Sequence, residues 1–348
     1  MNLLLTLATF FFLQGNLAQY VNPFIGTDKM GHTYPGASMP FGMVQLSPDT
    51  DTLSYESGGK YNKDVYRYCA GYQYSDRTIV GFSHTHFSGT GHSDLGDILI
   101  MPTTGRLQLN PGTAENPQSG FRSSFSHKRE MAEPGYYRVH LDDHGIEAEL
   151  AATTRVGIHR YTFPKSDSAH IILDLVHGIY NYEGKNVWTF VRVENDSTIT
   201  GYRQTNGWAR TRTVYFAIKF SKPFKSYGSK NFGPQSVYRG FWRKFDQTSN
   251  FPELAGSQLR AHFDFDTKEG EEVMVKVALS PVSTNGALAN MASEASGWDF
   301  EEYRRSGYET WERELEKIEV ETLTDGEKIN FYTAMYHAML GTTIYMDT

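Results

Sequence analysis

Apolar and polar residues alternate in short runs through most of the chain, from about residue 20 to residue 282. A period of two is typical of strands that bury one face and expose the other. Turn residues interrupt the runs every ten positions or so, and Asp143-His144-Gly145 is one such turn. The pattern predicts many antiparallel strands in series, and hence a β-sandwich. The clearest strand candidates are residues 136–141, 146–163, 170–176, 187–193, 214–220, 258–265 and 272–279.

The segment 258–265 shows this alternation plainly, because aromatic and aliphatic residues occupy every second position. Asp264 falls among the polar residues of the repeat, and Asp266 follows it at the same spacing. Both are therefore expected on a solvated strand face. Neither stands out as a catalytic acid or base.

The period changes after residue 282. A segment rich in Glu and Arg has apolar residues spaced by three and four, which predicts an amphipathic helix through Tyr308, Trp311, Leu315 and Ile318. A second helix is predicted to begin at Thr324, because Thr324-Asp325-Gly326-Glu327 has the form of a capping box, and to end near Gly341. The preceding helix is the only obvious partner for its apolar stripe, which consists of Ile329, Tyr332, Tyr336 and Met339.

The N-terminus carries an apolar run from residue 3 to residue 13, which is too short to span a bilayer. Small and polar residues follow it, so residues 1–18 are predicted to be a signal peptide cleaved at Ala18, with a buried first strand as the alternative. No other stretch could span a membrane. The single cysteine, Cys69, rules out an internal disulfide. We therefore expect an exported bacterial protein, periplasmic or secreted, without a membrane span after cleavage.

Composition narrows the range of partners. The 348 residues carry a formal net charge of -7 without a long basic run, which argues against a nucleic-acid partner. Aromatic residues make up 14% of the chain, with 22 Tyr and 22 Phe. Flat amphipathic rings can stack on sugar faces, although strand cores use the same residues.

The segment GFSHTHFSGTGHSDLGD, residues 81–97, concentrates the candidate chemistry. On a strand, His84 and His86 point to the same face, and His92 and Asp94 follow within reach, so zinc or iron binding is one hypothesis. A nucleophilic Ser88 is a weaker one, because glycine flanks it on one side only.

Two other interpretations of this segment involve no metal. In the first, it is a structural glycine-rich loop whose polar side chains bond to neighbouring backbone. In the second, it is a sugar-binding edge, with Phe87 as a stacking surface and His86, Ser88 and Thr90 as hydroxyl partners.

Several motifs, in order and spacing, resemble the N-terminal portion of glycoside hydrolase family 92, the exo-acting α-mannosidases. The resemblance covers nearly all of the chain after the N-terminal apolar run. The motifs that carry it are VNPFIGT (21–27), GHTYPGA (31–37), PFGMVQLSPD (40–49), GYQYSD (71–76), the segment 81–97, ELAATTRVGIHRY (149–161) and FYTAMYH (331–337).

The resemblance implies a β-sandwich of the supersandwich type, then helical linkers, then an (α/α)6 barrel, with the active site between the two domains. On this basis the expected domains are a sandwich over residues 19–282, a helical linker over 283–323 and the first helix of a truncated barrel over 324–348. The family is calcium-dependent and inverts at the anomeric carbon, which requires a carboxylic acid and a carboxylate that activates water. In the family these groups and most calcium ligands come from the barrel, so no catalytic residue is expected before Thr348.

The resemblance also implies site residues. Phe87 is similar to an aromatic residue that lines the leaving-group subsite, and Asp347 is similar to a residue that bonds mannose hydroxyls. The remaining substrate-binding candidates are His32, His86, Ser88, Gly89 and Thr90. Calcium prefers oxygen ligands, so this histidine-rich loop is an unsuitable main cage for it.

The expected function is an exported α-mannosidase that releases terminal mannose from mannose-rich glycans, with this chain supplying the N-terminal domain and part of the substrate cleft. One alternative is a carbohydrate-binding sandwich without hydrolytic activity. The other is a zinc or iron hydrolase that uses His84, His86, His92 and Asp94.

Overall fold

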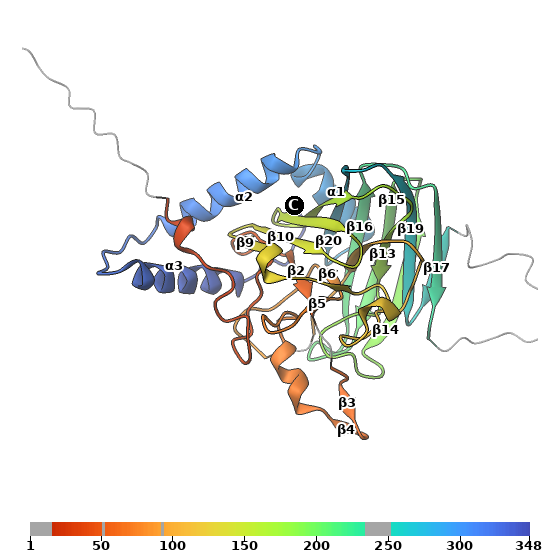
Figure 1. Cartoon of the computed structure of the whole chain (residues 1–348), viewed down its shortest axis with the longest axis horizontal. Coiled ribbons are helices and arrows are strands. Elements are labelled where there is room, and N and C mark those ends of the chain that lie inside the picture. The colour runs from red at the N-terminus through yellow and green to blue at the C-terminus, as the bar shows by residue number, and fades with distance from the viewer. Residues whose placement is uncertain (1–15, 51–52, 92–93, 234–251) are drawn as a thin grey trace, which may run out of the picture.

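The computed structural model describes residues 16–50, 53–91, 94–233 and 252–348. Two large antiparallel sheets stack face to face, and three α-helices follow them in the chain (Figure 1). One sheet has seven strands, in the order β1 (Ala37–Ser38), β2 (Gln45–Asp49), β6 (Gly81–Ser83), β7 (Leu99–Thr104), β13 (Ser166–Asp174), β19 (Leu259–Thr267) and β17 (Ser226–Asn231).

The other sheet has nine strands, in the order β18 (Glu253–Gly256), β14 (Asn186–Val193), β15 (Thr198–Thr205), β16 (Arg212–Phe220), β20 (Glu271–Ser280), β12 (Val156–Phe163), β11 (Ile146–Ala152), β10 (Tyr136–Leu141) and β9 (Glu130–Glu133). Two small ribbons pair β3 (Glu56–Ser57) with β4 (Lys60–Tyr61) and β5 (Thr78–Ile79) with β8 (Ser123–Ser124). The main core lies between the large sheets, where side chains such as Phe82, Ile171, Phe216 and Val275 are fully buried.

The predicted β-sandwich and its strands are confirmed, with local differences. The segment 146–163 forms two strands, β11 and β12, because the chain turns at residues 153–155. Strand β15 was not predicted, since its sequence TITGYRQT mixes polar residues into both faces. In β19 the alternation holds, because its apolar side chains face the core while His262 and Asp264 lie on the outer face.

The helices cover the sandwich on one side. The first, α1 (Thr284–Glu294), lays Ala287 and Met291 against the outer face of the nine-stranded sheet, where Ile158, Ala217 and Ala278 are buried. The second, α2 (Phe300–Leu315), follows the predicted periodicity, but Ile318 lies beyond its end and is half exposed. The third, α3 (Asp325–Leu340), begins with the predicted capping box at Thr324 and stops at the C-cap Gly341.

The apolar stripe of α3 has two partners. Tyr332 and Tyr336 are fully buried against α2 and against the short 3₁₀ helix η1 (Ala18–Tyr20), so the N-terminal segment adds a surface that the sequence pattern did not predict. The backbone amides of Leu17 and Ala18 also donate to the Glu312 carboxylate of α2, at 2.6 and 2.7 Å. Cleavage at Ala18, the predicted signal-peptide site, would remove both hydrogen bonds.

Candidate functional site

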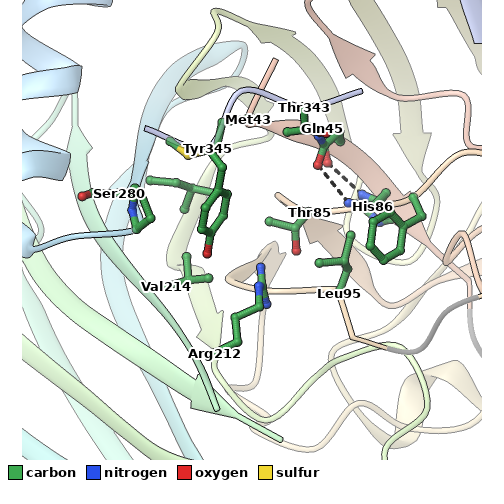
Figure 2. Close-up of a pocket in the computed structure, with 13 residues that line it drawn as sticks. Met43, Gln45, Thr85, His86, Leu95, Arg212, Val214, Ser280, Thr343 and Tyr345 are labelled. Carbon is green, nitrogen blue, oxygen red and sulfur yellow. Dashed lines mark hydrogen bonds between the residues drawn. The ribbon is translucent and has the colours of Figure 1, made fainter. Parts of the chain in front are cut away.

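A pocket of about 170 Å³ opens beside the chain that follows β6 (Figure 2). Sites that enclose a drug-sized ligand have volumes of roughly 300–1,000 Å³. This pocket is smaller, so it can hold only part of such a ligand. Figure 2 shows Arg212 pointing into it between Tyr345 and Leu95. The lining residues come from both sheets and from the C-terminal segment: Met43, Gln45, Thr85, His86, Phe87, Leu95, Arg212, Val214, Leu279, Ser280, Pro281, Thr343 and Tyr345.

A buried carboxylate holds two of the polar lining residues. Asp97 Oδ2 accepts hydrogen bonds from Thr85 Oγ1 at 2.6 Å and from Arg212 Nη1 at 2.7 Å, and Oδ1 accepts from Arg203 Nη1 at 3.0 Å. Burial alone would raise the pKa of Asp97, but the Arg212 and Arg203 guanidinium groups lower it to about 2. Asp97 therefore stays ionised and fixes both Thr85 and Arg212.

His86 lines the pocket, but both of its ring nitrogens already have partners. Nδ1 lies 2.7 Å from the Gln45 carbonyl oxygen, and Nε2 lies 2.9 Å from Asp49 Oδ1. The other oxygen of the fully buried Asp49 lies 2.9 Å from His177 Nε2. Burial alone would raise the pKa of Asp49, but the two imidazoles hold it well below its ordinary value. His86 thus fixes the loop and offers the pocket its ring surface.

His84 has a different environment from His86. Its Nδ1 lies 2.6 Å from the Ile98 carbonyl oxygen, and its Nε2 lies 2.9 Å from His159 Nε2. The side chain is fully buried, and this burial lowers its pKa to about 3. The two imidazoles, which strand geometry would place on one face, therefore contact separate partners, since β6 ends at Ser83 before either of them.

Backbone amides hold the Asp94 carboxylate. Its carboxylate oxygens accept from the backbone amides of Trp208 and Ala209, at 2.9 and 3.0 Å. His92 lies outside the described residues. Over the part of the chain that the structure describes, the zinc or iron hypothesis for this loop has no assembled ligand set.

The loop after Phe87 contacts another of the predicted site residues. The Gly89 amide donates to the His32 carbonyl oxygen at 2.7 Å, and both residues have positive φ, +73° and +52°. The His32 ring packs edge-on against Tyr66, and burial lowers its pKa. Ser88 Oγ is buried without a hydrogen-bond partner among the described residues, and Thr90 is half-buried. His32 and Gly89, 57 positions apart in the sequence, are thus neighbours.

The C-terminal segment supplies the remaining wall of the pocket. Thr343 and Tyr345 line it directly. The Asp347 carboxylate accepts hydrogen bonds from Ser280 Oγ and Asn290 Nδ2, both at 2.8 Å. Because Ser280 itself lines the pocket, Asp347 is placed next to it, with both oxygens held by the sandwich and α1.

Two family models match the chain in tandem. The "Glycosyl hydrolase family 92 N-terminal domain" matches residues 20–280, and the "Glycosyl hydrolase family 92 catalytic domain" matches residues 286–348. The chain belongs to glycoside hydrolase family 92. The first match contains both sheets of the family 92 sandwich, and the second begins within α1.

Solved family 92 structures share this fold. A family 92 alpha-mannosidase from Bacteroides thetaiotaomicron is 43% identical, with a TM-score of 0.85 over 96% of this chain and 42% of its own. The same enzyme has been solved with mannoimidazole. A family 92 inverting mannosidase from the same organism is 25% identical, with a TM-score of 0.71 over 93% of this chain and 39% of its own.

A curated relative from Arthroderma benhamiae, named an uncharacterized secreted glycosidase, is 25% identical over 95% of this chain and 42% of its own length. The chain thus spans about two fifths of the length of these relatives.

Some residues of the site were not predicted from the sequence, notably Arg203, Arg212, Asp49 and His177. Asp49 lies in the PFGMVQLSPD motif, but nothing in that motif or around the other three residues indicates their roles, because these depend on contacts between segments far apart in the chain. The available signal is indirect. Arg203 is a charged residue inside a strand, and such a residue must find a buried partner when its side chain faces the interior.

Proposed function

We propose that the protein is an exported α-mannosidase that releases terminal mannose from mannose-rich glycans, and that this chain supplies its N-terminal domain and one wall of the substrate cleft. One observation carries the proposal: 43% identity and a TM-score of 0.85 to a solved family 92 alpha-mannosidase, over 96% of the chain. The pocket between the two sheets and the C-terminal segment fits this role, because it opens at the junction of the two family matches.

The pocket suggests how the work is divided among its residues. Phe87 presents a half-buried aromatic ring on which a leaving-group sugar stacks. Ser88, Gly89 and Thr90 continue that rim, with His32 behind them. His86 positions the loop through its bonds to Gln45 and Asp49. Asp347 accepts hydrogen bonds from mannose hydroxyls once they replace the Ser280 and Asn290 donors.

We assign the linker to residues 283–323, which contain α1 and α2, and the first barrel helix to α3 within 324–348. Inversion needs a general acid and a general base on opposite faces of the sugar, roughly 6.5–9.5 Å apart. No carboxylate lines the pocket described above. We therefore place both catalytic carboxylates in the portion of the family that this chain does not match.

Calcium is the cofactor that the family implies. Among the described residues, the only grouping of three potential ligands consists of His170, His262 and Asp264, which is nitrogen-rich, whereas calcium takes oxygen ligands. The described residues thus do not fit a calcium cage. We place its ligands with the catalytic carboxylates.

Two observations support export: the apolar run at the N-terminus and the relative that is named as secreted. Within the described residues, no helix is both long enough and apolar enough to cross a membrane. We propose a periplasmic or secreted bacterial enzyme.

Mannose release from a panel of α-linked mannobiosides tests the proposal. The 348-residue chain and the same chain joined to a complete family 92 catalytic domain are assayed in added calcium and in excess chelator. We expect release only from the joined protein and only with calcium. Release by the 348-residue chain would contradict the placement of the catalytic pair. Failure of the joined protein on every linkage, with mannoside binding retained, would favour a binding module without hydrolytic activity.

A further inference from the structure

We propose that His170, His262 and Asp264 form a binding site for a divalent transition metal ion such as zinc, on the outer face of the seven-stranded sheet. The site is independent of the proposed function and of the histidine-rich loop at residues 81–97. Strands β13 and β19, which carry it, are adjacent interior strands of that sheet (Figure 1).

Sheet register brings the three side chains together. His170 in β13 lies directly opposite Asp264 in β19, so both project from the same face. His262 is two positions before Asp264 in β19 and shares that face. On the far side of β19, the residue paired with His262 is Gly228 of β17, which adds no side chain there.

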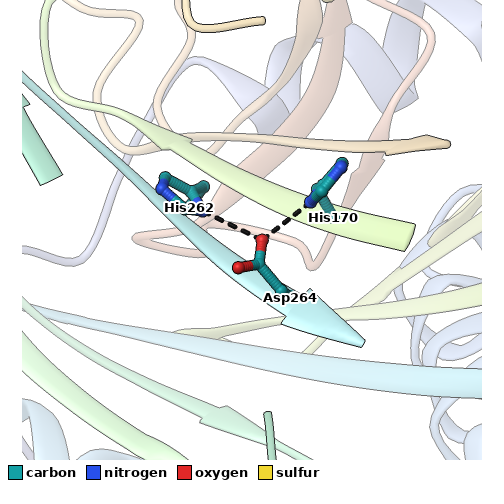
Figure 3. Close-up of side chains that lie close together, drawn as sticks. All are labelled: His170, His262 and Asp264. Carbon is teal, nitrogen blue, oxygen red and sulfur yellow. Dashed lines mark hydrogen bonds and ion pairs between the residues drawn. The ribbon is translucent and has the colours of Figure 1, made fainter. Parts of the chain in front are cut away.

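The potential ligand atoms converge on one point (Figure 3). Asp264 Oδ1 lies 2.7 Å from His170 Nδ1 and 2.9 Å from His262 Nδ1. Zinc takes nitrogen and oxygen ligands at about 2.0–2.2 Å, and tetrahedral geometry then separates neighbouring ligand atoms by roughly 3.3–3.6 Å. The two nitrogen–oxygen distances therefore need to widen by roughly 0.4–0.9 Å to hold the ion.

The hydrogen bonds of the His170 ring favour a cation at this point. His170 Nε2 lies 2.9 Å from the Gly105 carbonyl oxygen, which can only accept, so Nε2 carries a hydrogen. Nδ1 then faces a carboxylate oxygen and needs either a second proton or a metal ion. A metal ion takes the place of that proton, which leaves to solvent. A metal-bound histidine almost always donates its other ring N–H to a carboxylate, a backbone carbonyl or water, and His170 has such a carbonyl partner.

A hydrogen bond also orients the Asp264 carboxylate. Ser226 Oγ donates to Asp264 Oδ2 at 2.6 Å, which leaves Oδ1 for the two imidazoles. Lys225, the neighbour of Ser226 in the chain, is paired with Asp266 at 2.6 Å. The three ligand side chains are 10–16% exposed, so an ion can enter and water can complete its coordination. Two imidazoles and one carboxylate suit zinc and similar ions better than calcium or magnesium.

The test uses the untagged 348-residue chain, because a histidine tag would bind the same metals. Titration calorimetry with zinc chloride in excess calcium should give one site per chain. The variants His262→Gln and Asp264→Asn should each weaken binding at least about tenfold. A matched control is His140→Gln, since His140 also faces a carboxylate, Glu147 at 3.2 Å, but lies on the other sheet. This variant should bind zinc as the unmodified chain does.

Crystallography locates the ion without relying on any variant. A zinc-soaked crystal should show an anomalous peak within bonding distance of both Nδ1 atoms. The proposal is overturned if the unmodified chain binds no zinc, or if the peak lies elsewhere. Zinc affinity in a folded His262→Gln variant equal to that of His140→Gln would also overturn it, because the triad would then be a hydrogen-bonded cluster only.

Discussion

Replacing Asp97 with Asn should destabilise the sandwich strongly. The carboxylate is fully buried and joins Thr85, Arg203 and Arg212. Arg203 is itself fully buried, so its guanidinium would lose its ionic partner while remaining out of water. The Asn amide would also direct N–H donors at groups that are themselves donors, and at least one of the three hydrogen bonds must be lost.

The expected loss is large because only one side of the network is removed. Removing one partner from a buried ion pair costs about 3–5 kcal/mol. The same isosteric change in an exposed pair should cost less than about 1 kcal/mol. Glu253→Gln provides that comparison, because Glu253 and its partner Arg192 are 45% and 47% exposed.

Equilibrium urea unfolding at pH 7 measures both variants against the unmodified chain. Asp97→Asn should lower the free energy of unfolding by about 3–5 kcal/mol, and Glu253→Gln should leave it nearly unchanged. A loss for Asp97→Asn no greater than that for Glu253→Gln would refute the reasoning, because the buried guanidinium groups would then not depend on the carboxylate.

The same network predicts that the free energy of unfolding depends on pH in the acid range. The pKa of Asp97 is about 2 in the folded chain, against an ordinary value of 3.8. A depressed pKa contributes stability that is fully present above about pH 4 and is lost as the pH falls through 2. The difference between these two pKa values corresponds to roughly 2 kcal/mol of stability. The difference in the free energy of unfolding between the unmodified chain and Asp97→Asn should therefore narrow between pH 4 and pH 2. A constant difference would contradict the depressed pKa of Asp97.

Three further substitutions probe the helices and the pocket. Trp311→Ala should cost about 3–5 kcal/mol in urea unfolding, because the indole is fully buried and donates to the Ser38 carbonyl oxygen at 2.7 Å; a loss below 1 kcal/mol would count against this packing. Thr324→Ala removes the capping box with Glu327 and should cost about 1 kcal/mol by the same measurement, whereas no loss would show that the cap adds nothing. In the joined protein, Phe87→Ala should raise KM for mannobiosides, whose leaving group is a sugar, several-fold more than KM for aryl mannosides with an activated leaving group. Equal effects on both substrates would argue against stacking of the leaving-group sugar on Phe87.

The sequence predicted the elements whose signals are local. The period of two identified most long strands, and the Thr324 capping box located the start of α3. Strand β15 was missed because its sequence TITGYRQT mixes polar residues into both faces. Ile318 fits the helical spacing of α2, yet the helix stops at Leu315, since spacing alone does not show where a helix ends.

The sequence brought together part of the pocket lining where residues lie close in the chain, while the substrate-binding roles of these residues stay predictions. Phe87 and His86 both line the pocket, and His32 meets Gly89. Long-range pairing was not predictable. Asp264 alternates with aromatics and was expected on a solvated face, but sheet register brings it against His170, which lies 94 positions away in the sequence.

The most direct test of the central claim is a proton NMR time course of an α-linked mannobioside with the joined protein in calcium. The account predicts that β-mannose appears first, and that α-mannose accumulates only later by mutarotation, because an inverting enzyme reverses the anomeric configuration. Initial release of α-mannose, or no mannose from any linkage, would contradict the assignment of this chain to an inverting α-mannosidase.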